Sequence, residues 1–178
     1  MNYLRIDTDD MLNGDGLRVV LWVAGCSHKC KGCQNKHTWN PKQGTEFTDK
    51  TLKEICRLIK KSHISGITFT GGDPLHKNNI KEITEISKYL REKFPNKTQW
   101  LYTGSTYEEV KELEIAKTID ILVDGVFEEK LHDNTLMWKG SSNQRVIDMN
   151  KSGEEAYIYC PNHKVKSVLK NEDYTHKN

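Results

Sequence analysis

Short apolar runs alternate with amphipathic segments along most of this chain. The apolar runs predict four strands, at residues 17–24, 66–70, 98–103 and 119–123. The segments between them predict helices, because their apolar residues recur every three or four positions, over residues 50–61, 79–94 and 105–117. Strands that alternate with helices form βαβ units, so the pattern predicts an α/β fold with a parallel sheet.

The helix and strand signals weaken beyond the fourth predicted strand. Ser105 and Glu108 predict a capping box for the third helix, and residues 156–160 predict a last strand. The length of 178 residues suits a single domain over 1–178, with a core of about 12–160. We expect the polar residues 161–178 to form a partly flexible C-terminal extension, with its lysines, Lys164, Lys166 and Lys170, on a solvated face.

Unusual residues follow each of the four predicted strands directly. They are Cys26–Cys33, Gly71–Pro74, Thr103 with Gly104, and Asp124 with Gly125. Ligands of open α/β sheets and barrels collect at the carboxyl ends of the parallel strands. We therefore expect these four turns to meet at one rim of the sheet, where the functional site would lie.

Composition excludes several classes of protein. The 27 basic and 25 acidic residues give a net charge of +2, so no nucleic-acid partner is expected. Apolar runs are too short to span a membrane, and no secretory leader precedes the first strand, so a cytoplasmic location is expected. Five cysteines, three of them within eight residues, suit metal binding better than a disulfide framework.

The cysteine loop reads GCSHKCKGCQN over residues 25–35. Its C-x3-C-x2-C spacing would let Cys26, Cys30 and Cys33 hold a four-iron cubane on three of its irons. The fourth iron would remain open to a small molecule, which distinguishes a reactive cluster from one that only carries electrons. The alternative is a zinc knuckle completed by a fourth ligand, for which the candidates are His28, His37, Cys56 and Cys160.

Position within the chain weakens the zinc alternative. The loop follows a buried strand, whereas zinc ribbons usually carry paired CxxC knuckles on hairpins. Cys56 falls on the apolar stripe of a helix and is interpreted as a core residue. We expect His28 and His37 to be polar loop residues, and the role of Cys160 stays open.

Several further motifs accompany the cysteine loop in a fixed order. They are GDGLR at 14–18, GCQN at 32–35, GGDPL at 71–75, YTG at 102–104, DILVDG at 120–125 and WKGSSNQR at 138–145. The loop resembles the signature of the radical S-adenosylmethionine superfamily. The whole set, from about residue 12 to 148, is similar to the activating proteins of anaerobic (class III) ribonucleoside-triphosphate reductases.

The resemblance implies an incomplete parallel βα barrel of the radical S-adenosylmethionine type. A complete barrel needs roughly 250 residues, so one side would stay open to a partner. The implied cofactors are a [4Fe–4S] cluster on the three cysteines and S-adenosylmethionine, whose amino and carboxylate groups would chelate the open iron. The implied cofactor-binding residues are Gly32, Cys33, Gln34, Gly71, Gly72, Asp73 and Pro74. Without the cysteine loop, Gly71–Pro74 would be interpreted as a plain turn.

The resemblance also implies an oxidoreductase activity. A reduced cluster would split S-adenosylmethionine, and the resulting 5′-deoxyadenosyl radical would take a hydrogen atom from a glycine of the reductase large subunit. No side-chain acid or base is needed. The implied partners are the large subunit, in a heterotetramer or larger complex, and a reductant such as flavodoxin.

Two rival functions and three residues stay open. A small radical enzyme acting on a small molecule would share the cysteine loop, and a zinc-binding module would have no activity. Asn143 and Arg145 lie in a segment interpreted as a surface turn that could also contact the cofactor or the reductase. Asp124 could bind a ribose or a backbone amide, and Arg18 is interpreted as a solvated residue beside the first strand.

Overall fold

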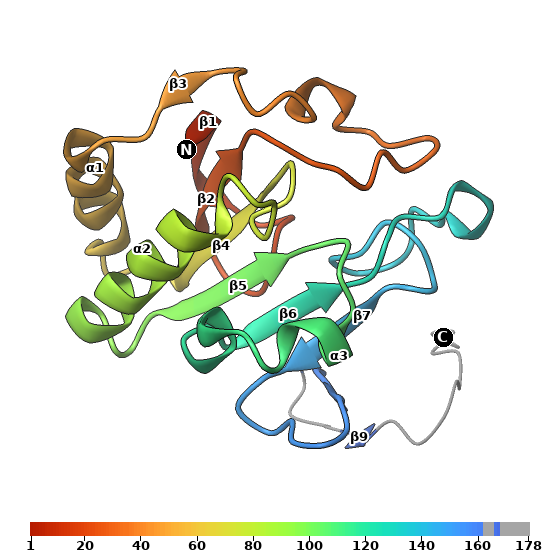
Figure 1. The fold of residues 1–178 in the computed structure, drawn as a ribbon. Helices are drawn as coiled ribbons and strands as arrows, with labels where there is room; N and C mark the ends of the chain where they lie inside the picture. Colours follow the sequence, from red (N-terminus) through yellow and green to blue (C-terminus); the bar gives the residue numbers. More distant parts are fainter. Residues whose placement is uncertain (162–165, 168–178) are drawn as a thin grey trace.

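The computed structural model describes residues 1–161 and 166–167, and its centre is one open nine-stranded sheet (Figure 1). The strand order is β3-β1-β2-β4-β5-β6-β7-β8-β9. The strands are β1 (Asn2–Asp10), β2 (Arg18–Val23), β3 (Thr45–Glu46), β4 (Gly66–Gly71), β5 (Thr98–Tyr102), β6 (Ile121–Asp124), β7 (Arg145–Asp148), β8 (Tyr157–Ile158) and β9 (Lys166–Ser167). The predicted α/β fold is confirmed, and the sheet does not close on itself.

Four parallel strands, β2, β4, β5 and β6, form the middle of the sheet. They are the four strands that the apolar runs predict, and β2 is buried over its whole length. The sheet is nevertheless mixed, because β1 and β7 pair antiparallel with β2 and β6. The predicted parallel sheet is therefore confirmed in the middle, and antiparallel strands extend it at both flanks.

Helices cover one face of the sheet. α1 (Asp49–Ile59) and α2 (Ile80–Lys93) pack their apolar stripes on alternate residues of the parallel strands, and together these residues form the main hydrophobic core (Figure 1). A smaller apolar cluster lies on the opposite face, around Trp100 and Val123. Because side chains alternate along a strand, the second face is free to line a site.

The third predicted helix is shorter than expected. α3 spans only Tyr107–Val110, and a short 3-10 turn, η2 (Glu114–Lys117), follows it. The cap is also one residue later than predicted, because the Thr106 N–H donates to the Glu109 carboxylate at 2.8 Å. Leu113 is extended and packs against the main core, which interrupts the helix.

Arg18 is buried, so its interpretation as a solvated residue is wrong. Its guanidinium donates to Thr68 Oγ1 at 2.7 Å, to the carbonyl of Ile67 at 2.7 Å and to the carbonyl of Thr98 at 2.9 Å. It also lies over the Trp100 ring, 5.3 Å from the centroid. Burial lowers the pKa of Arg18 to about 10.

The remaining expectations concern the chain ends. The last predicted strand is confirmed as β8, and β9 pairs with it antiparallel. The rest of the predicted C-terminal extension, residues 162–165 and 168–178 with Lys164 and Lys170, lies outside the described residues. Among the helices of the described part, none combines the length and apolar character that a membrane span requires.

Candidate metal centre

The turns that follow the parallel strands meet at one rim, as predicted. The Gly72 N–H donates to the Val23 carbonyl and the Asp73 N–H to the Gly25 carbonyl, each at 2.8 Å. The Thr103 N–H reaches the Val123 carbonyl at 3.0 Å. Backbone hydrogen bonds therefore join the base of the cysteine loop to the turn after β4, and the end of β5 to β6.

The cysteine loop is anchored mainly at its two ends. The Gly25 and Cys26 N–H groups donate to the carbonyls of Thr38 and Trp39 at 2.7 and 3.1 Å. At the other end, the Thr38 N–H donates to the Asn35 carbonyl at 2.9 Å, and within the loop the Cys33 N–H donates to the Cys30 carbonyl at 3.2 Å. The 3-10 helix η1 (Lys36–Thr38) thus pins the loop against the end of β2.

The three loop cysteines are free thiols and partly buried. Burial raises the pKa of Cys26, and hydrogen bonds from the backbone amides of His28 and Lys29 act against this rise. The Asn35 N–H donates to the Cys33 sulfur at 3.4 Å. Backbone amides that point at sulfur favour the thiolate, which is the form that binds iron.

No three His, Cys, Asp or Glu side chains of the described residues are grouped closely enough to hold a single metal ion. In a cubane, each protein thiolate binds a different iron. The thiolates that hold a cubane are therefore farther apart than the ligands of one zinc ion. Cys56 is buried in the main core, as expected, and Cys160 is a free thiol that is partly buried.

Asp73 is engaged with protein groups. The side chain is 3% exposed, and its Oδ1 accepts from Thr103 Oγ1 at 2.9 Å and from the Leu75 N–H at 2.8 Å. Its Oδ2 lies 2.5 Å from His28 Nε2, and this hydrogen bond raises the pKa of His28. Each oxygen thus has a protein partner, and these bonds use three of the about four acceptor positions of the carboxylate.

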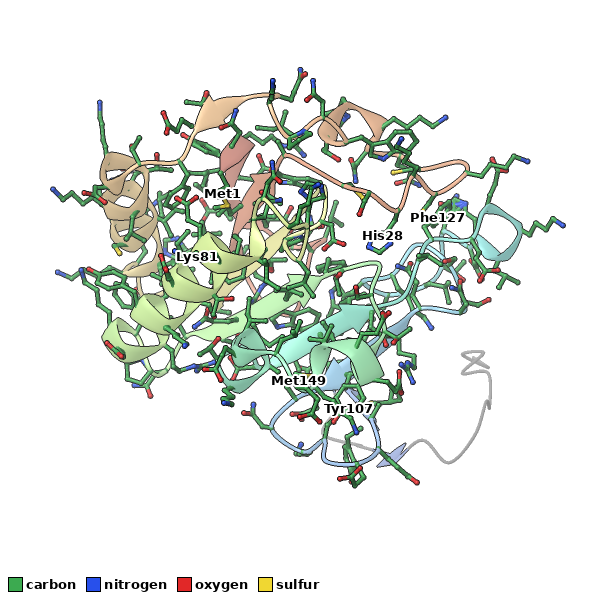
Figure 2. All side chains as sticks on the ribbon, in the orientation of Figure 1. Met1, His28, Lys81, Tyr107, Phe127 and Met149 are labelled. Atoms are coloured by element: carbon green, nitrogen blue, oxygen red, sulfur yellow. The ribbon has the colours of Figure 1, made fainter. Side chains whose placement is uncertain are left out.

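His28 is the site residue that the sequence did not single out. It was interpreted as a polar loop residue, yet it joins the cysteine loop to the turn after β4. In the view of Figure 2, His28 lies on the side of the molecule away from Lys81. His28 and Asp73 are 45 positions apart, so no local pattern links them.

A cavity of about 330 Å³ lies beside the loop, on the sheet face without helices. Its lining combines the end of the loop with strand residues and with the segment before β7; it includes Cys33, Gln34, Trp22, Thr70, Tyr102 and Trp138. The Tyr102 hydroxyl is buried there without a hydrogen-bond partner among the described residues. Gly71, Gly72, Asp73 and Pro74 do not line this cavity.

Gly32 and Gly72 occupy places where a side chain would collide with a neighbour. Gly32 has φ +74°, and a Cβ there would lie 2.7 Å from a Glu129 carboxylate oxygen. A Cβ on Gly72 would lie 2.4 Å from the Gly25 carbonyl oxygen. Glycine at these two positions lets the loop approach its neighbours closely.

The late motif is part of the framework. Asp124 is 1% exposed, and its Oδ2 accepts from Arg145 Nη2 at 2.5 Å and from the Tyr107 N–H at 2.7 Å. Of the two roles open to Asp124, the structure shows the contact with a backbone amide. Asn143 Nδ2 donates to the Val126 carbonyl at 2.8 Å, and Arg145 begins β7, so the segment leads from a turn into a strand.

Comparison with known proteins gives concordant results. A family model described as "4Fe-4S single cluster domain" matches residues 12–147. An anaerobic ribonucleoside-triphosphate reductase-activating protein of enterobacteria phage T4 is 47% identical over 146 residues, which cover 82% of this chain and 93% of the phage protein. Proteins of the same name from Pasteurella multocida and Escherichia coli K12 are each 39% identical over 150 residues, covering 81% and 82% of this chain and 95% and 97% of their own length.

Proposed function

This chain belongs to the family of anaerobic ribonucleoside-triphosphate reductase-activating proteins, and from that membership we propose that it generates a glycyl radical on the large subunit of such a reductase. Cys26, Cys30 and Cys33 would hold a [4Fe–4S] cluster and leave one iron for S-adenosylmethionine. When bound and reduced, the cluster supplies the electron that splits S-adenosylmethionine into methionine and a 5′-deoxyadenosyl radical, which takes a hydrogen atom from the glycine.

One observation carries this proposal. Three free, partly buried thiols lie on one loop at the carboxyl end of β2, within the residues that the iron–sulfur family model matches. The donor set suits iron, because thiolate ligands favour iron–sulfur clusters. Backbone amides directed at the sulfurs of Cys26 and Cys33 would stabilise the negative charge of a cluster.

The residues proposed to bind S-adenosylmethionine belong to two groups. Gly71 and Gly72 form a turn against the loop base, and their backbone would receive the methionyl amine. Cys33 and Gln34 line the cavity, and with Gly32 they would lie along the nucleoside. Asp73 and Pro74 complete the turn, and Asp73 would act mainly by holding His28 and Thr103.

The cavity mouth favours a macromolecular substrate. Four exposed apolar side chains either line the cavity or adjoin a residue that does; they are Met11, Leu12, Val126 and Met137. Large apolar side chains that stay exposed together are typical of a protein–protein interface. The partial barrel proposed for this fold would stay open on this side, and a glycine loop of the large subunit would enter there.

Further details of the assembly belong to the same proposal. The electron would come from a small redox protein such as flavodoxin, and the complex with the reductase would be a heterotetramer or larger. Size-exclusion chromatography of the mixed subunits with light scattering gives the stoichiometry. A mixture that elutes only as separate subunits at micromolar concentration contradicts a stable complex.

Anaerobic reconstitution tests the central step. The chain is loaded with iron and sulfide, reduced with dithionite and mixed with S-adenosylmethionine, and 5′-deoxyadenosine is quantified. We expect product from the wild type, none from Cys26→Ser, Cys30→Ser or Cys33→Ser, and full activity from Cys56→Ser. One zinc and no iron after anaerobic isolation would favour the zinc module instead. Product without a glycyl radical signal on the large subunit would favour a small-molecule enzyme.

A further inference from the structure

The imidazole of His28 joins three turns of the site. Its Nε2 lies 2.5 Å from Asp73 Oδ2, and Asp73 in turn accepts a hydrogen bond from Thr103 Oγ1 at 2.9 Å. The contact therefore links the cysteine loop after β2 to the turn after β4 and to the end of β5. Asp73 is 3% exposed, so water competes little for this hydrogen bond.

The His28 ring also packs against the backbone of Gly104. A Cβ on Gly104 would lie 2.5 Å from His28 Cδ2 and 2.7 Å from His28 Cγ and Nε2. The imidazole therefore packs directly on the backbone of residue 104, where only glycine leaves room for it. Gly104 is not in the left-handed region, so the space for the ring is the reason for glycine at this position.

The segment between the first two cysteines has few other attachments. Among the described residues, no backbone N–H from 27 to 32 donates to another backbone group. Lys29 adopts φ +49°, a conformation that a lysine rarely adopts unless its neighbours impose it. The amides of His28 and Lys29 lie near enough to the Cys26 sulfur to act against the rise in its pKa that burial causes. The side-chain contact of His28 is thus the main tertiary tie of this turn.

We propose that His28 is a positioning residue for the metal centre. By bonding Asp73 and packing on Gly104, it fixes the turn from Cys26 to Cys30 before any metal binds. It thereby fixes the backbone that carries the Cys26 and Cys30 thiols. This inference rests on the proposed role of the three cysteines as cluster ligands.

Limited proteolysis of the metal-free full-length chain tests the first half of the inference. Lys29 and Lys31 are exposed trypsin sites inside the loop, so their initial cleavage rates report how often the turn opens. A hydrogen bond to a charged group resists opening by a factor of roughly 10 to 100. We therefore expect His28→Ala to raise both rates at least tenfold.

Two variants and one control make this measurement specific. His28→Gln places an amide near the position of Nε2, and we expect it to restore at least part of the protection. Gly104→Ala should raise the cleavage rates as well, because its methyl group displaces the ring. His63→Ala is the matched control, since His63 Nε2 also bonds an aspartate, Asp9, at 2.9 Å but on an exposed surface outside the loop.

Cluster retention tests the second half. After anaerobic reconstitution, an iron chelator is added and the absorbance of the cluster is followed over time. This absorbance should decay at least tenfold faster in His28→Ala than in the wild type or His63→Ala. The inference is overturned if His28→Ala keeps the wild-type rates of cleavage and decay, or if His28→Gln is as open as His28→Ala. A wild type that binds iron but cleaves no S-adenosylmethionine would instead refute the proposed function and leave this result standing.

Discussion

Single residues of this chain are held by contacts that reach across the sheet. Arg18 is the largest buried polar side chain, and its donors satisfy carbonyl and hydroxyl oxygens of β4 and β5. Its positive charge lies on an aromatic ring rather than on a carboxylate. The planar guanidinium therefore acts as a connector at the amino ends of the parallel strands.

We predict that Arg18→Lys will destabilise the fold by roughly 2–4 kcal/mol, because a lysine cannot satisfy several buried oxygens in one plane. Arg18→Met should cost a similar amount, since it leaves those oxygens unpaired. Urea unfolding followed by circular dichroism measures the change. Exposed Arg57 is the control, and Arg57→Lys should leave the urea midpoint at the wild-type value.

The second prediction for a single residue concerns the effect of Gly72→Ala on the cysteine loop. The added methyl group would lie 2.4 Å from the Gly25 carbonyl oxygen, which is backbone and cannot rotate away. The turn after β4 must then move from the base of the cysteine loop. We expect cluster content after reconstitution to fall at least threefold. Gly153→Ala is the control, because its added methyl group meets nothing within 4 Å.

At the scale of elements, β6 and β7 are joined by one buried carboxylate. Asp124 on β6 bonds Arg145 on β7 and the first amide of α3. We predict that Asp124→Asn will lower the free energy of unfolding by about 1–3 kcal/mol, because a neutral amide cannot accept all these bonds. Glu108→Gln removes the exposed partner of the same arginine and should cost under about 0.5 kcal/mol. Equal losses in urea unfolding would contradict this difference.

The elements that the sequence predicts well are those whose residues bury one continuous apolar surface. The runs that become β2 and β4 and the stripes of α1 and α2 are of this kind. β1 escapes prediction because it alternates polar residues at the flank of the sheet, and its burial depends on β2. β7 escapes because only four residues follow a polar turn, and its pairing with β6 is decided by tertiary contact.

The same distinction applies to the site. The three cysteines can be identified from the sequence because their spacing is local. The side chains that support them cannot, since His28 and Asp73 are distant in sequence and come together only in the folded chain. The resemblance implies that Asp73 contacts the cofactor, and the structure adds that its oxygens also bond to protein groups. Sequence therefore indicates which atoms could bind the cluster, and the structure indicates what holds them.

At the scale of the whole molecule, the two faces of the sheet differ in what covers them. Helices cover one face, whereas the other carries the cavity and a border of exposed apolar side chains. Met11 is 69% exposed and Met137 is 49% exposed, on separate segments beside that cavity. Exposed methionines next to cavity-lining residues suit a surface that adapts to a protein partner.

We predict that Met11→Asp and Met137→Asp will each weaken binding to the reductase large subunit at least tenfold, because each places a charge in a desolvated contact. Neither side chain lines the cavity, so formation of 5′-deoxyadenosine should stay at the wild-type level. The yield of glycyl radical at limiting subunit, measured by electron paramagnetic resonance, should fall in proportion. Tyr89→Asp is the matched control, because Tyr89 is 40% exposed but lies on α2, across the sheet from the cavity. If Tyr89→Asp weakened binding while both methionine variants did not, the reductase would dock on the helical face, and the open side of the sheet would need another partner.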